Sequence, residues 1–300
     1  MDSKQTSQAG YEGGAAEFLF NQPNACQRLS LARIFLAVIC LVQVLFGAYD
    51  RFYAETSEIL FSPGFPFYFF PPLGKGFYLL KAVTILSAVA LGLGLKTRSA
   101  NVVLAGSFLL LNFYVSYFGA STWSYNTHLN FFLIALCFAD SSRHYSLDKL
   151  LNRPRRAALR PVGQETASFV LSFMQIYVAV LYLQSGVSKL LYGGMGWYLG
   201  GQTLFVFTIR GGTSFGLYLA QYPWVFKLLA VGTGIFEFGF FFLCFYRKAH
   251  KLLAVAATVF HLSVWLTMGI SFWFLWLLLP ALFWLKSGEP TPRPLLSRQG

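Results

Sequence analysis

The chain has 300 residues, of which 56% are hydrophobic and only 11% are charged, and it contains repeated apolar runs long enough to cross a bilayer. This composition excludes a soluble α/β domain, whose helices need a charged face. The net charge of +12 does not indicate a nucleic-acid partner, because the basic residues lie in short connections between apolar runs, where such residues set membrane topology.

A polar segment precedes the first apolar run. Residues 1–27 contain Asp2, Glu12 and Glu17 and lack the basic start and short apolar core of a cleaved signal peptide. We therefore expect a polar N-terminal tail and an uncleaved first span. The run FLF at positions 18–20 is compatible with a contact on the membrane surface or with a disordered tail.

The apolar runs predict an all-α transmembrane helix bundle of about eight spans over residues 28–286, followed by a short tail over residues 287–300. The last two predicted helices form a short hairpin, because their region is interrupted by Gly269 and Pro280. The predicted helices cover residues 28–49, 76–95, 99–118, 126–140, 167–192, 224–246, 251–268 and 271–286.

The basic residues between the predicted spans fall mainly on alternate connections. The outer connections hold only Arg51, Lys75 and Arg210, whereas the other basic residues outside the spans lie on the opposite side. The positive-inside rule therefore predicts cytoplasmic N- and C-termini. We expect an integral, multi-pass protein surrounded by the lipid bilayer, with no nucleic-acid partner.

Two of the outer connections, residues 60–72 and 193–223, are long, aromatic and short of charge. Proline and glycine should break regular structure there, while aromatic side chains favour the membrane interface. Both segments are compatible with a lid over a site opening on that side, or with a belt that anchors the bundle. The glycines of the second segment do not have the spacing of a phosphate-binding loop.

One face of the fifth predicted span carries a polar stripe. Gln175, Tyr182 and Lys189 are seven residues apart, and Ser185 lies one turn before Lys189, so a helix directs them toward other helices rather than lipid. A charge within the membrane costs about 2.5–3.5 kcal/mol. Lys189 therefore needs a partner, or it must snorkel to the outer interface.

Other ionisable residues lie at defined depths in the predicted spans. Lys81 and His128 belong to the outer parts of the second and fourth spans, whereas Glu237 and His261 fall near the midplane. The last two could pair, either as a structural tie between helices or for chemistry. Arg33 lies near the cytoplasmic end of its span and should snorkel.

The sequence lacks the common catalytic and metal-binding motifs. HExxH and GxSxG are absent and the cysteines show no CxxC spacing, so we expect neither a metal site nor a disulfide. The catalytic role that remains open is that of a general base. A lysine in an apolar pocket can lose its charge and then remove a proton from a weakly acidic, lipid-soluble substrate.

Two blocks carry a family resemblance. The runs WSYNTHLNFFLIALCFADSSRHYSLDKLLN (residues 123–152) and QIYVAVLYLQSGVSKLLYGGMGW (residues 175–197) are similar to the membrane domain of vitamin K-dependent γ-carboxylase and its bacterial relatives, the horizontally transferred transmembrane (HTTM) proteins. The resemblance implies that Lys189 is the base that deprotonates a reduced quinone. It implies an assisting role for His128, whose spacing differs from the family pattern by about one helical turn. It also implies a bacterial cytoplasmic (inner) membrane.

The chain shares further features with this family and also departs from it. Glu237 and His261 fit the family pattern, but the acidic residue expected just before Trp197 is replaced within the run LYGGMG. The chain ends at Gly300 without a large extramembrane domain that would bind a glutamate-rich substrate. We therefore do not expect carboxylation of protein glutamates.

The sequence leaves three functions open. In the first, a membrane enzyme performs quinone- or lipid-linked chemistry, with Lys189 and His128 as catalytic residues and a reduced quinone as the cofactor implied by the resemblance. The residues that would position a substrate or pair helices are Glu237, His261, Gln175 and Tyr182. The second is a non-enzymatic membrane factor that helps a peptide toxin mature or leave the cell, of the sporulation-delaying type. The third is a proton-coupled transporter, against which the two halves show no inverted repeat.

Overall fold

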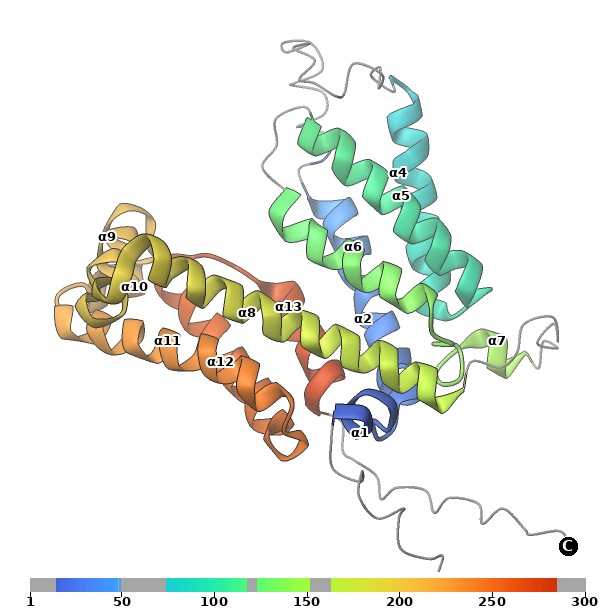
Figure 1. The fold of residues 1–300 in the computed structure, drawn as a ribbon. Coiled ribbons are helices and arrows are strands. Elements are labelled where there is room, and N and C mark those ends of the chain that lie inside the picture. Colours follow the sequence, from blue (N-terminus) through green and yellow to red (C-terminus); the bar gives the residue numbers. More distant parts are fainter. Residues whose placement is uncertain (1–14, 48, 50–73, 118–122, 152–162, 285–300) are drawn as a thin grey trace, which may run out of the picture. The chain divides into compact units, whose positions relative to one another are not determined.

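A computed structural model describes residues 15–47, 49, 74–117, 123–151 and 163–284, and the elements assigned in these residues are helical (Figure 1). In chain order, the helices before residue 152 are α1 (Ala15–Phe20), α2 (Ala25–Phe46), α4 (Gly76–Leu93), α5 (Thr97–Tyr117), α6 (Trp123–Cys137) and α7 (Leu147–Leu150). The helices after residue 162 are α8 (Gln164–Gly200), α9 (Gln202–Gly211), α10 (Ser214–Leu219), α11 (Pro223–Cys244), η2 (Arg247–Ala249), α12 (His250–Met268), α13 (Trp273–Leu279) and η3 (Pro280–Trp284).

Six helices in the described residues are long and apolar enough to cross a membrane, and two more apolar helices, Asn126–Cys137 and Trp273–Trp284, are shorter. Each of the eight predicted spans overlaps one of these helices, so the predicted all-α membrane bundle is confirmed. The last helix changes to a π-helix at Pro280, because proline has no N–H to donate to the preceding turn. The exact number of spans and the side on which each end lies stay predictions.

Residues Ala25–Val170 form one compact unit, which contains α2, α4, α5, α6 and α7. Its apolar core is tied by a buried polar triangle near one end of the helices. The Tyr49 hydroxyl donates to Asn112 Oδ1 at 2.8 Å, and Asn126 Nδ2 donates to both of these atoms, at 2.9 and 2.8 Å. Because α5 and α6 supply the two asparagines, the triangle fixes the register between these helices.

Arg33 is fully buried and anchors the loop that follows α6. Its guanidinium donates to the carbonyl oxygen of Ser141 at 2.9 Å and to that of Tyr145 at 2.5 Å. The prediction that Arg33 snorkels to the interface is wrong, because the carbonyl groups of this loop solvate its charge inside the protein.

The short helix α7, which follows this loop, is fastened to the turn between α4 and α5. The Asp148 carboxylate accepts hydrogen bonds from the backbone N–H groups of Lys96 and Thr97 and from the Thr97 hydroxyl, while the Asp148 N–H donates to the carbonyl of Gly94. Gly94 ends α4 with a φ of 70°, and a Cβ atom there would lie 2.5 Å from Ser146 Cβ. Glycine therefore permits both the helix end and the close approach of the loop.

The second compact unit joins the N-terminal residues to Leu171–Gly300. Phe18 of α1 is buried, and its ring centroid lies 5.5 Å from that of Phe245. Ser172 Oγ donates to the Phe18 carbonyl at 2.7 Å, and Arg247 Nη1 lies 3.1 Å from Glu17 Oε1. Glu17 and Phe18, in the described part of the predicted polar tail, thus pack against the helical unit, while contact of this run with the membrane surface stays a prediction.

The predicted outer connection over residues 193–223 is largely helical, contrary to the irregular structure predicted from its glycines. After a break at Gly194 (φ 60°, ψ −168°), α8 continues to Gly200, and α9 and α10 follow. Gly201, at φ 66°, is the N-cap residue of α9, and a Cβ atom there would lie 2.5 Å from the backbone of Phe226. The other outer connection, residues 60–72, lies outside the described residues.

Candidate functional site

The polar stripe of α8 faces three other helical elements, as predicted. Gln175 Nε2 donates to the Leu282 carbonyl of η3 at 2.7 Å, and the Tyr182 hydroxyl lies 2.7 Å from His261 Nε2 of α12. Lys189 contacts Glu237 of α11. The seven-residue spacing therefore places three polar groups on one face of α8, and each of them finds a different partner.

Lys189, Ser185 and Glu237 form a compact polar cluster between α8 and α11. The Lys189 ammonium donates to Ser185 Oγ at 2.6 Å and to Glu237 Oε1, and Ser185 Oγ donates to the same carboxylate oxygen at 2.9 Å. Because Ser185 precedes Lys189 by one turn, both side chains reach the single acid on α11. Lys189 thus has an acidic partner, whereas a lysine that snorkels to the interface needs none.

The two charges of this cluster differ in burial. The Glu237 side chain is 2% exposed, whereas the Lys189 side chain is 24% exposed, and its Nζ atom lies 5.3 Å from the centroid of the Trp197 ring. Within the described residues, Glu237 Oε2 is buried without a hydrogen-bond partner. The lysine is therefore the end of the cluster that a ligand can reach, and the carboxylate keeps one unused acceptor.

Close contact between α8 and α11 brings these groups together. A Cβ atom at Gly186 would lie 3.2 Å from the Phe238 ring and 3.4 Å from Glu237 Cβ, so the glycine of the GVSK run lets the helices approach. The Tyr198 hydroxyl donates to the Gly186 carbonyl at 2.7 Å. Sequence reasoning did not single out Tyr198 or this use of Gly186, although a glycine three residues before a membrane lysine was a visible signal.

Tyr182 and His261 form a separate contact in an aromatic environment. The centroid of the Tyr182 ring lies 4.8 Å from that of Phe236 and 4.6 Å from that of Phe240, and the His261 ring lies 5.2 Å from Phe272. His261 Nε2 contacts Tyr182, and Nδ1 has no hydrogen-bond partner within the described residues. This pair is a polar tie in an otherwise apolar part of the helical unit.

The predicted pairing of Glu237 with His261 is wrong. Glu237 Oε1 accepts from Lys189 and Ser185, and the remaining carboxylate oxygen and His261 Nδ1 have no hydrogen-bond partner in the described part of the chain. Depth in the membrane was estimated from residue counts along each helix, which do not give the face of the helix on which a side chain lies. Glu237 lies on the face of α11 that contacts Lys189, and His261 lies on the face of α12 that contacts Tyr182.

His128 and Lys81 belong to the other compact unit, on α6 and α4, and both side chains are half-buried. The assisting role implied for His128 stays a prediction.

Membrane-length apolar helices joined by internal polar contacts define an integral, multi-pass membrane protein. Residues 21–287 match the family model of the HTTM domain. The chain therefore belongs to the HTTM family and is a membrane protein related to the γ-carboxylase family, as the resemblance predicted. No curated protein and no solved structure matches the chain with significance.

Proposed function

We propose that the cluster of Lys189, Ser185 and Glu237 is a proton-accepting site for a weakly acidic, lipid-soluble substrate, with a reduced quinone as the representative compound. The observation that carries this proposal is the graded burial of the charge pair: the acid is enclosed, while the lysine end is partly open. A substrate hydroxyl can approach the exposed end of Lys189 without separating α8 from α11.

The contact with Glu237 makes the ion pair as a whole, and not Lys189 alone, the proton acceptor. The Lys189 ammonium already donates to Ser185 Oγ and Glu237 Oε1, so the atom of the pair that can accept a further hydrogen is on the Glu237 carboxylate. The pair as a whole can still take up one proton. The O–H bond of the substrate breaks, a new bond to hydrogen forms on the pair, and the charge of the pair changes from zero to plus one.

The protonated pair is suited to hold the anion that results. Lys189 remains a cation beside the deprotonated oxygen, and preorganised charge of this kind in a dry site stabilises an ion more strongly than water-exposed charge does. Trp197 lies over the same ammonium group and presents an aromatic face close to where a flat ring would bind. His128 is assigned the assisting role only by the family resemblance.

The test is the binding of a reduced naphthoquinone to the detergent-purified protein under anaerobic conditions, with ultraviolet difference spectra to detect the ionised quinol. Wild type is expected to bind and ionise the quinol. Lys189→Met should bind it with an ionised fraction lower by about tenfold or more, because each 1.4 kcal/mol of lost anion stabilisation changes the ionisation constant about tenfold. Lys227→Met, which removes an exposed lysine of α11, should behave as wild type.

Equal ionisation by wild type and Lys189→Met would contradict the proposal. Absence of quinol binding by the wild-type protein would favour the alternative function, a non-enzymatic factor for peptide maturation or export. In that case the charge pair serves as a tie between α8 and α11.

A further inference from the structure

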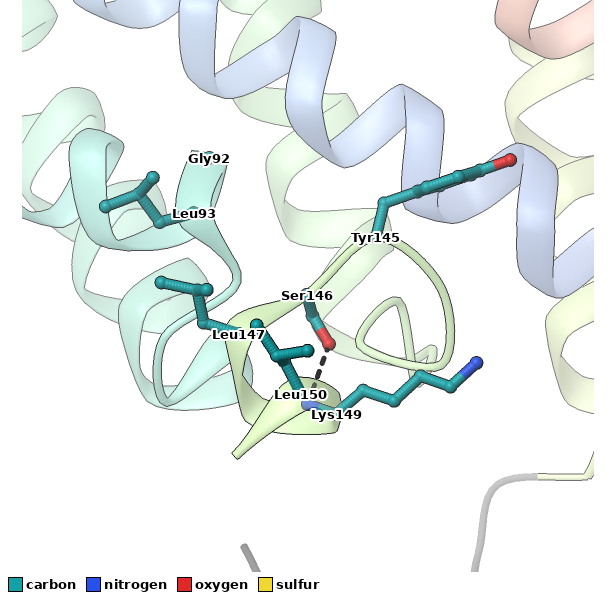
Figure 2. Close-up of a pocket in the computed structure, with 7 residues that line it drawn as sticks. All are labelled: Gly92, Leu93, Tyr145, Ser146, Leu147, Lys149 and Leu150. Carbon is teal, nitrogen blue, oxygen red and sulfur yellow. Dashed lines mark hydrogen bonds between the residues drawn. The ribbon is translucent and has the colours of Figure 1, made fainter. Parts of the chain in front are cut away.

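A surface pocket of about 650 Å³ lies where the loop after α6 meets the end of α4 (Figure 2). Leu93, Leu147 and Leu150 give it apolar walls, and Tyr145 and Lys149 contribute polar groups. In the view of Figure 2, Leu93 and Leu147 lie to the left, while the hydroxyl of Tyr145 and the ammonium group of Lys149 lie to the right. The pocket is therefore amphipathic.

The pocket is held in shape by contacts that do not involve any ligand. Arg33 binds the carbonyl of Tyr145, which keeps this residue at a left-handed φ of 53°. A non-glycine residue in that region is strained and persists only where its surroundings fix it. Ser146 caps α7 by accepting from the Lys149 N–H at 3.2 Å, and Asp148 fastens the loop to the α4–α5 turn. The site is therefore preformed.

The charge around the pocket is positive. Asp148 is engaged by the α4–α5 turn, and Asp140 is paired with Arg143 at 3.4 Å. Within the described residues, the Lys149 ammonium has no carboxylate partner, and Lys149 is exposed. Burial lowers the pKa of His144 below its usual range, and the charges of Lys149 and Arg143 lower it further.

An apolar stripe on α4 leads into the pocket. Leu86, Val89 and Leu93 are 69%, 41% and 49% exposed, and their spacing of three and four residues places them on one face of the helix. Leu93 also lines the pocket. A hydrocarbon chain can therefore run along the membrane-embedded helix and end beneath a cationic group at its terminus.

We propose that this pocket binds an anionic phospholipid, with the headgroup phosphate at Lys149 and one acyl chain along Leu86, Val89 and Leu93. A soluble phosphate would use the lysine but not the stripe, and a zwitterionic lipid would lack the net negative charge that matches the basic rim. The loop that forms the pocket belongs to the block of residues 123–152 in which the family resemblance was found, and the proton-accepting site does not use it.

The test compares dioleoyl phosphatidylglycerol with dioleoyl phosphatidylcholine by native mass spectrometry of the full chain purified in detergent, with glycerol 3-phosphate as a soluble competitor. Wild type should retain the anionic lipid, and the competitor should not displace it. Lys149→Gln should weaken its binding about fivefold, because one lysine near an anionic headgroup contributes about that factor. Lys251→Gln, an exposed lysine at the start of α12, is the matched control.

The apolar part of the site is tested separately with Leu93→Ser against Leu110→Ser, an exposed leucine of α5. Only Leu93→Ser should weaken retention of the anionic lipid. Equal retention of the two lipids by wild type, full competition by glycerol 3-phosphate, or equal losses in each variant and its control would overturn the proposal.

Discussion

Lys189→Met is expected to lower the free energy of unfolding by about 3–5 kcal/mol, because removing one partner of a buried pair leaves an uncompensated charge. Glu237, at 2% exposed, would stay buried with only Ser185 as a donor from α8. The measurement is unfolding of the purified protein by denaturing detergent, monitored through the loss of the helical circular dichroism signal.

The double variant Lys189→Met with Glu237→Gln is expected to recover most of this loss, because a neutral amide can be buried beside methionine at a much smaller cost than a carboxylate. Lys227→Met should stay within about 0.5 kcal/mol of wild type, as expected for an exposed site. A stability of Lys189→Met equal to that of Lys227→Met would mean that the pair is not buried as described.

Arg33→Met is expected to have the second large effect. The substitution leaves the Tyr145 carbonyl oxygen without its donor and the Ser141 carbonyl oxygen with Ser30 Oγ alone, and a buried unsatisfied group costs about 1–3 kcal/mol. The loop after α6 and the adjoining α7, which carries Asp148, should also loosen, so hydrogen exchange of the amides in residues 141–150 should become faster. The same unfolding and exchange measurements on Arg98→Met, an exposed arginine of α5, provide the control.

If Arg33→Met matched Arg98→Met in both measurements, the loop would have to be held by the Asp148 contacts alone. That result would contradict the anchoring role of the buried guanidinium.

Much of the helical architecture could be predicted from the sequence because each long apolar run permits few alternatives in a bilayer. The stripe of Gln175, Tyr182 and Lys189 was predictable for a similar reason, since heptad spacing fixes the face of a helix independently of its neighbours. The family followed from the residues around Lys189 and from the block that begins at residue 123, and the match over residues 21–287 confirms it.

The partners of the polar groups could not be predicted, because they depend on how helices rotate against one another. Glu237 and His261 have similar depths, yet α11 turns Glu237 toward Lys189, and α12 turns His261 toward Tyr182. Arg33 was misassigned since its acceptors are backbone carbonyls, which carry no signal in the side-chain sequence. In residues 193–223, Gly201 and Gly212 cap α9, a use that composition does not distinguish from a loop.

The most direct test of the central claim is quinol ionisation by the double variant Lys189→Met with Glu237→Gln. This variant should keep the contact between α8 and α11 without a group that accepts the proton. The proton-accepting account predicts that it is nearly as stable as wild type and binds the reduced naphthoquinone without ionising it. Ionisation at the wild-type level by this stable variant would contradict the account and place the base elsewhere in the protein.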